Sequence, residues 1–140
     1  MSDIADDLRA VVRTIVQSAE RGSSSGPQWK RVWSELQTAG ITQIAGRDAG
    51  SEGGDLDDLV ACVQELAAAA VSTPLIEHAT AGWAAPNSLE TDAVLDTVAV
   101  GTTHLSVSDQ LMSGSVRARW AAEAKHLVLV LPDGLVFGSG

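Results

Sequence analysis

The sequence predicts an α+β protein: a helical domain of about four helices at residues 1–85, then a short antiparallel β segment at residues 86–140. Two observations support this division. In the first part, apolar residues recur at three- and four-residue steps, which is typical of one face of an amphipathic helix. After Pro86 the apolar runs become short, rich in β-branched residues, and separated by glycine, proline and aspartate, which is typical of strands and turns.

The first two helices are predicted on either side of a serine-rich connector, Gly22–Gly26. Acidic residues at the start of the first helix favour the positive end of its dipole. Its apolar stripe consists of Ile4, Leu8, Val11, Val12, Ile15, Val16 and Ala19. Pro27 opens the second helix and Gly40 closes it, as is usual for these residue types. Trp29, Val32, Trp33 and Leu36 share a face of that helix, and we expect Trp29 and Trp33 to pack it against the third helix.

The third helix, at about residues 55–71, has the clearest sequence pattern. Gly53 and Gly54 tolerate a positive φ, and Asp55 can accept a hydrogen bond from a free amide at the helix start. The apolar face is predicted to contain Leu56, Leu59, Val60, Val63, Leu66, Ala67 and Ala70. A proline at position 74 ends this segment and opens a fourth helix, at about residues 75–83. The expected core includes Leu8, Val12, Ile15, Trp33, Leu36, Leu59, Val63 and Leu66.

Four or five strands are predicted in the second part, at residues 94–100, 104–107, 111–120, 127–131 and 135–137. The run Leu127–Leu131 is apolar throughout, which suits a strand buried on both faces. Pro132, Asp133 and Gly134 follow it and predict a turn before the last strand.

Composition narrows the possible functions. The net charge is −9, with −5 in residues 1–70 and −4 in residues 71–140, so both halves would repel a phosphate backbone. We therefore expect no nucleic-acid partner. No apolar run approaches the length of a membrane span, and the acidic N-terminus lacks the pattern of a signal peptide. These features predict a cytoplasmic protein with no membrane partner.

Few residues are candidates for independent chemistry. Cys62 lies near the apolar face of the third helix and is expected to be a buried, inert thiol. The segment Gly22–Gly26 matches the Gly-x-Ser-x-Gly pattern of a nucleophile elbow. Such an elbow needs a preceding strand, whereas this segment joins two predicted helices, so we interpret it as a linker. Glycines 50, 53 and 54 are interpreted as turn residues. We predict no metal site, because none of the histidines has a partner at metal-ligand spacing: His78, His104 and His126.

Three basic residues of the second half, Arg117, Arg119 and Lys125, lie close together in the sequence. They could form a local anion site. The alternative is a solvated strand edge, where cations are common.

The helical part resembles the N-terminal domain of the acyl-CoA dehydrogenase family. That family carries a glycine-rich turn, a helix of the type Leu-x-Asp-Leu-x-x-Val-x-Glu-Glu-Leu-Gly, then alanines and a small-x-Pro-Leu segment. The matching residues are Gly53, Gly54, Leu56, Asp58, Leu59, Val63, Glu65, Leu66, Ala68, Ala69, Thr73, Pro74 and Leu75. The run Trp33–Thr42 is similar to the family's Trp-x-x-Leu-x-x-x-Gly-Leu-Thr helix end. The resemblance covers about residues 1–85 and is weaker beyond them.

The resemblance implies flavin-dependent α,β-dehydrogenation of an acyl-CoA thioester, with FAD as cofactor. Residues 114–127 are similar to a family strand that passes the flavin, which places Trp120 and Ala121 near that cofactor. Core packing or burial at a subunit contact is the alternative role for Trp120.

The family's Thr-Glu-Pro motif and its glutamate-bearing C-terminal bundle are not found in these 140 residues. We therefore assign no catalytic residue and expect the isolated chain to be inactive. We also expect its second half to form a homo-oligomer or a heteromer with a family member. The alternative to an enzyme is a non-catalytic interaction module or subunit.

Overall fold

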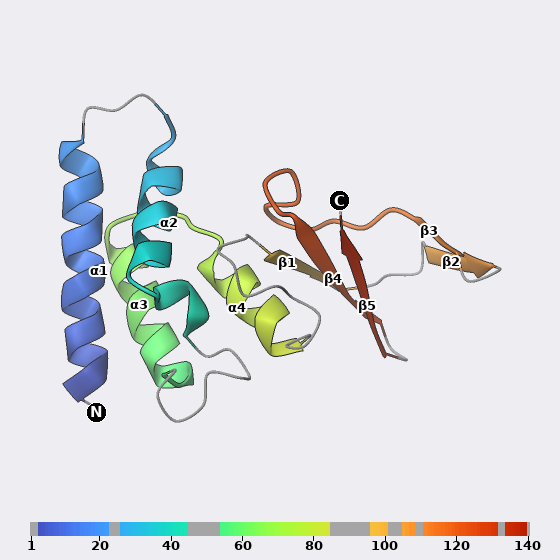
Figure 1. Ribbon diagram of the computed structural model, residues 1–140, viewed down its shortest axis with the longest axis horizontal. Coiled ribbons are helices and arrows are strands. Elements are labelled where there is room, and N and C mark those ends of the chain that lie inside the picture. Colours follow the sequence, from blue (N-terminus) through green and yellow to red (C-terminus); the bar gives the residue numbers. More distant parts are fainter. Residues whose placement is uncertain are drawn as a thin grey trace.

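The structure, a computed structural model, describes residues 3–22, 26–44, 54–84, 96–100, 105–108, 111–131 and 134–139. The helices are α1 (Asp3–Arg21), α2 (Gln28–Thr38), a short 3-10 helix η1 (Ile41–Gln43), α3 (Leu56–Ala68) and α4 (Leu75–Ala84). The strands are β1 (Asp96–Val100), β2 (Leu105–Ser108), β3 (Leu111–Gly114), β4 (His126–Leu131) and β5 (Gly134–Ser139). Figure 1 shows the helices gathered at one end of the molecule and the strands at the other. The predicted α+β class is confirmed.

The main core lies among α1, α2, α3 and α4 and the turns that join them. Helices α1 and α3 lie side by side (Figure 1), and polar contacts join them along their outer edge. Arg9 donates to Gln64 Oε1 at 2.9 Å, and Arg13 Nη2 lies 2.9 Å from Glu65 Oε1. Of the expected core, six side chains are buried: Val12, Ile15, Trp33, Leu36, Leu59 and Leu66. The other two, Leu8 and Val63, are partly buried against this cluster.

The start of α3 is built as the sequence predicts. Asp55 Oδ1 accepts a hydrogen bond from the Asp58 amide at 3.0 Å, and Asp58 Oδ2 accepts one from the Asp55 amide at 3.1 Å. These reciprocal bonds satisfy two amides that the helix itself leaves free. Gly54 precedes them with φ +76, and an added Cβ there would lie 3.2 Å from both Asp58 Oδ2 and Ile44 Cγ2. A side chain at position 54 would therefore strain the backbone and crowd the cap.

The predicted apolar faces of α1 and α3 are wider than the buried surface. Leu56 is 67% exposed, Val60 is 43% exposed, and Ile4 and Val11 are also exposed. Periodicity alone assigned these residues to the core. In the folded domain the core side of each helix is covered by its neighbours, and these four side chains lie outside the covered strip.

The strands form a three-stranded sheet in the order β1-β4-β5 and a separate β2-β3 hairpin. Strand β1 runs parallel to β4, from Asp96 opposite His126 to Val100 opposite Val130. Strand β5 is antiparallel to β4, and β2 to β3. The sheet is therefore mixed, and the expectation of a wholly antiparallel segment is wrong for the β1–β4 pair. The connection between β1 and β4 is long enough to place them parallel, as a short hairpin could not.

Strand β4 is central and its consecutive residues Val128 and Leu129 are both buried, as expected for a strand covered on two faces. Helix α4 packs against β1 and joins the two parts of the molecule. The strand predicted over residues 111–120 ends at Gly114, and the chain then follows turns to Lys125. None of the described helices combines the length and the apolar character that crossing a bilayer requires.

The buried face of α3 gives a direct test of the helical core. Leu59 is 8% exposed, whereas its neighbour Val60 is 43% exposed. We expect Leu59→Ala to lower the free energy of unfolding by about 2–4 kcal/mol, because a cavity replaces a packed side chain. Val60→Ala is the control and should change it by about 0.5 kcal/mol or less. Urea unfolding of both variants measures this, and equal effects would mean that the face of α3 is assigned wrongly.

Candidate functional site

Residues 115–125, between β3 and β4, bring the helices and the sheet together. The segment lies where three elements meet, since it contacts α2, α4 and β1 through different side chains. Two consecutive residues, Arg119 and Trp120, make these contacts. They are the centre of the candidate site, and Trp120 is one of the two residues for which the sequence predicts a flavin contact.

Trp120 adopts a left-handed backbone conformation, φ +63. Such a conformation costs a residue with a side chain about 1–2 kcal/mol. The turn around it is closed by its own carbonyl, which accepts hydrogen bonds from the amides of Glu123 at 3.0 Å and Ala124 at 2.9 Å. Its ring packs against Trp29 of α2, with ring centroids 4.8 Å apart and planes tilted by 55°. A pair of this kind contributes about 0.5–1.5 kcal/mol beyond its buried area, so it offsets much of the backbone strain.

Trp120 also holds an unused hydrogen-bond donor. Its Nε1 is buried and has no hydrogen-bond partner among the described residues. A buried N–H without an acceptor costs about 1–3 kcal/mol, so this donor opposes folding. Ala121, the second predicted contact, is exposed beside it.

Arg119 ties the same turn to β1 and α4. Its carbonyl accepts a hydrogen bond of 2.6 Å from the hydroxyl of Thr97, a fully buried residue of β1. Its Nε lies 3.5 Å from Glu77 Oε1 of α4. Because the guanidinium is 73% exposed, the ion pair contributes little to stability. The buried hydroxyl bond is the stronger positional constraint.

The two tryptophans of α2 make ring contacts that the sequence does not predict. Trp33 is buried in the core cluster that also contains Leu59 and Leu66 of α3, and Trp29 packs against that cluster. In addition, the ring of Trp29 contacts Trp120, and the ring of Trp33 meets the ring of His78 on α4 at 5.4 Å. His78 is half-buried. These long-range ring contacts depend on how the elements pack, and no local sequence signal predicts them.

The other residues that the sequence offered as possible site residues are partly described by the structure. His126 is buried at the first position of β4, and His104 lies outside the described residues. No group of three metal-ligating side chains occurs in the described ranges. Residues 23–25 of the Gly-x-Ser-x-Gly match and Gly50 and Gly53 also lie outside those ranges. Arg117 and Lys125 are exposed beside the ion-paired Arg119, in keeping with a solvated edge.

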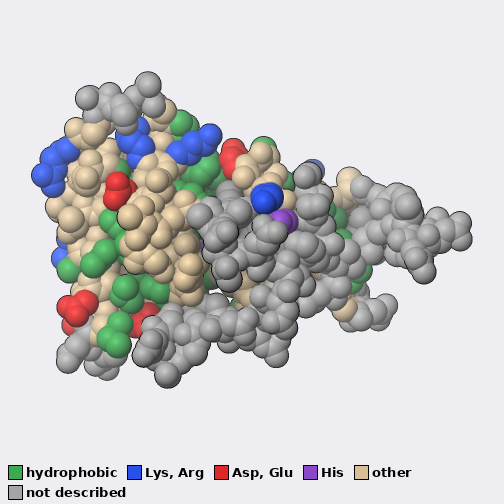
Figure 2. All heavy atoms as spheres, in the orientation of Figure 1, with side chains coloured by type: hydrophobic (Ala, Val, Ile, Leu, Met, Phe, Trp, Pro, Cys, Tyr) green, Lys and Arg blue, Asp and Glu red, His purple; other side chains and the backbone are tan. Residues whose placement is uncertain are grey.

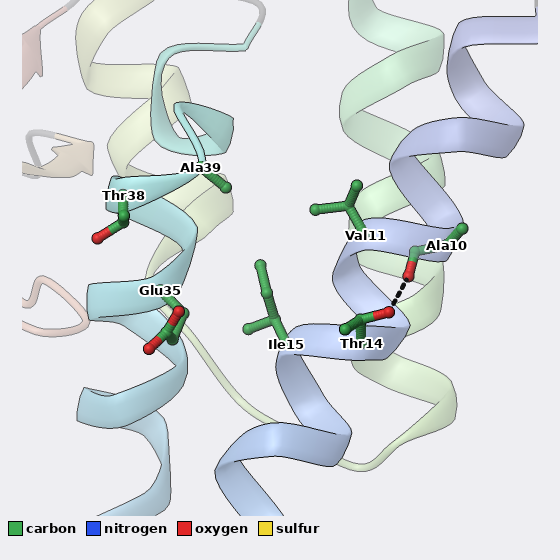
Figure 3. Close-up of a pocket in the computed structure, with 7 residues that line it drawn as sticks. All are labelled: Ala10, Val11, Thr14, Ile15, Glu35, Thr38 and Ala39. Carbon is green, nitrogen blue, oxygen red and sulfur yellow. Dashed lines mark hydrogen bonds between the residues drawn. The ribbon is translucent and has the colours of Figure 1, made fainter.

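Two shallow hollows lie between α1 and α2, away from the Trp29–Trp120 contact. The first has a volume of about 360 Å³ and is lined by Ala10, Val11, Thr14 and Ile15 of α1 and by Glu35, Thr38 and Ala39. In Figure 3 the side chains of Val11 and Ile15 point from α1 toward α2. The second, about 430 Å³, is lined by Ser18, Ala19, Gly22, Lys30, Arg31, Ser34 and Glu35. Glu35 lines both hollows.

Cys62 is fully buried in the core, as predicted. Burial raises the pKa of its thiol to about 11, with a further contribution from the nearby Asp58 carboxylate, while Arg9 acts in the opposite direction. The thiol is therefore neutral and protected at physiological pH, and it is a poor nucleophile.

The raised pKa of Cys62 predicts the pH range in which it affects stability. Folding holds the thiol neutral, so its contribution is complete below pH 9 and is lost as the pH rises from 9.0 through about 11. We expect a loss of stability in that range that Cys62→Ala does not show. At pH 8 the native thiol should react with a disulfide reagent only as fast as the protein unfolds. Rapid labelling of the native protein would contradict its burial.

Comparison with known proteins shows similarity in structure and not in sequence. No family model matches the chain, and neither does any curated protein. Two chains from solved structures of acyl-CoA dehydrogenases are similar in fold. One belongs to the ChsE4-ChsE5 complex from Mycobacterium tuberculosis, with a TM-score of 0.66 and 17% identity over 99% of this chain and 48% of that one.

The other solved structure is the Tcur3481-Tcur3483 steroid ACAD, in a G363A variant. Its TM-score is 0.63 and its identity is 19%, over 95% of this chain and 46% of that one. The chain thus spans about half the length of the solved structures that it matches. At this identity the similarity shows the fold.

Proposed function

Because these 140 residues are similar in fold to about half of each of two acyl-CoA dehydrogenase chains, we propose that they supply the N-terminal helical domain and the opening strands of such a flavoprotein. The observation that supports this is the fit of 99% and 95% of the chain to two dehydrogenase chains. The proposed reaction is α,β-dehydrogenation of an acyl-CoA thioester. One neighbour is described as a steroid ACAD, so thioesters with a ring-bearing acyl group belong among the first substrates to test.

In this proposal Trp120 and Ala121 contact the flavin. The described residues fit such a role, because Trp120 Nε1 is a buried donor without a partner and Ala121 beside it is exposed. A flavin ring offers nitrogen and oxygen acceptors to such a donor. When bound, the flavin supplies the hydride acceptor, and the protein supplies position and electrostatics. Thr97 and Glu77 contribute by holding Arg119, and Trp29 contributes by holding the Trp120 ring.

We assign the proton-abstracting base to none of the described carboxylates. Glu65 and Glu77 are ion-paired with arginines, and Asp58 caps α3. In this proposal the base is supplied from outside the described residues, as the resemblance implies, and catalysis then depends on an assembly.

A second candidate function is a non-catalytic subunit that assembles with a partner. Among the described strands, β1 and β5 each pair on one side only, and such edges can accept a further strand. One of the similar structures is a complex of two named proteins, ChsE4 and ChsE5, which also favours a heteromer. Flavin binding distinguishes this function from the first.

Flavin binding is tested by titrating FAD into the purified chain and following tryptophan fluorescence and flavin absorbance. We expect weak uptake that Trp120→Phe reduces severalfold, because phenylalanine keeps the ring but lacks the Nε1 donor. Trp83→Phe is the matched control, since Trp83 is 62% exposed on α4. A colourless chain that takes up no FAD would favour the non-catalytic subunit.

Turnover is tested separately, with an artificial electron acceptor, added FAD and short, medium, long and steroid-bearing acyl-CoAs. We expect no activity from the 140 residues alone, since the described carboxylates include no assigned base. Robust turnover by the pure chain would refute this assignment. Turnover that appears only on mixing with a second chain would support the proposed assembly.

A further inference from the structure

The first turn of α2 carries positive charge at the end of the helix where it is least favourable. Helix α2 begins at Gln28, so Lys30 lies close to the positive end of the helix dipole, and the turn has no acidic residue and no side-chain cap. The next residue, Arg31, is also basic, but its guanidinium donates to the carbonyls of Gly26 at 2.8 Å and Ala19 at 3.2 Å. These bonds account for Arg31 and not for Lys30.

The ammonium of Lys30 lies over an aromatic ring. Its Nζ is 5.5 Å from the centroid of the Trp29 ring, within the range of a cation–π contact. This ammonium makes no ion pair or hydrogen bond with any described residue. Figure 2 shows further Lys and Arg side chains gathered over this end of the domain, where α1 finishes and α2 begins. The Trp29 ring is therefore the partner of the ammonium among the described residues.

The same Trp29 ring packs against Trp120, with centroids 4.8 Å apart and planes tilted by 55°. Because a cation is attracted to the face of an indole ring, Lys30 favours one orientation of the Trp29 ring. That orientation in turn limits where the Trp120 ring and its buried Nε1 donor lie. We propose that Lys30 is a positioning residue for the candidate flavin contact and that it acts through Trp29. This inference rests on the proposed function, in which Trp120 contacts the flavin.

The charge of Lys30 has two effects of opposite sign on the fold. Removing it relieves the unfavourable interaction with the dipole of α2, which favours the helix. Removing it also takes away the attraction that orients the Trp29 ring. We therefore expect Lys30→Gln to leave the unfolding midpoint nearly unchanged and still to weaken flavin binding. A lysine with a merely structural role would not separate stability from binding in this way.

The ring contact is measured first, in the full chain without flavin. Two indole rings in contact give an exciton couplet in circular dichroism, and Trp120→Phe identifies the part that the Trp29–Trp120 pair contributes, because it removes that part. We expect Lys30→Gln to lose much of this couplet and Lys30→Arg, which keeps a cation, to retain it. Arg21→Gln at the end of α1 is the matched control, since it also takes the net charge from −9 to −10.

Flavin binding is measured next, by titrating FAD and riboflavin into the same variants. Lys30→Gln should raise both dissociation constants about two- to fivefold, which corresponds to the loss of one exposed cation–π contact. Lys30→Arg should raise them less, and Arg21→Gln should change them least. Riboflavin carries no phosphate, so an equal effect on both flavins separates positioning through Trp29 from direct binding of a phosphate by Lys30. Thermal unfolding verifies that each variant remains folded.

Three results would overturn the proposal. The first is a couplet that Lys30→Gln leaves intact. The second is a loss of affinity for FAD alone, which would mean that Lys30 binds a phosphate directly. The third is native binding of both flavins that Lys30→Gln does not weaken, in which case the flavin contact stands and only the role of Lys30 is wrong. A native chain that takes up neither flavin would instead refute the proposed flavin contact, and the positioning role with it.

Discussion

The contacts of Arg119 and Trp120 are the constraint on which the relation between the helices and the sheet depends. Trp120 packs on Trp29 of α2, and the Arg119 carbonyl accepts a hydrogen bond from Thr97 of β1. The Arg119 side chain pairs with Glu77 of α4. Together with the packing of α4 on the sheet and of Ala124 against the helical core, these contacts join the described β segment to the helical domain. They position the turn for which we propose a flavin contact.

The energetics of that turn favour a second role besides packing. The left-handed conformation of Trp120 and its unpaired Nε1 both oppose folding, by about 1–3 kcal/mol each. Ring packing and the buried Thr97 hydroxyl bond offset them. Strain and an unused donor at one residue are the observations behind the flavin contact that we propose for Trp120.

Sequence reasoning was most successful where local physics decides the structure. The cap at Asp55, the positive φ of Gly54 and Gly40, and the buried positions of Leu36 and Leu66 follow from residue types and spacing. It failed where the outcome depends on neighbours far along the chain. Leu56 fits the apolar period of α3 but no element covers it, and the parallel β1–β4 pairing has no local signal. The contacts of the Trp29 ring with Trp120 and of the Trp33 ring with His78 were missed for the same reason.

The candidate site was predicted only in part. The resemblance identified Trp120 and Ala121. It did not identify Trp29, which contacts Trp120 from 91 residues away, or Glu77 and Thr97, which contact Arg119 from 42 and 22 residues away. The two hollows between α1 and α2 were also not predicted, because they require the relative placement of two helices.

The central claim is that the helical domain and the β segment are coupled through the rings of Trp29 and Trp120. A double-mutant cycle with Trp29→Leu and Trp120→Leu, measured by urea unfolding, tests it most directly. The account predicts a coupling free energy of about 0.5–1.5 kcal/mol, since each single change removes the same ring pair. Effects that add to within about 0.3 kcal/mol would show that the two rings do not interact, and the claim would be wrong.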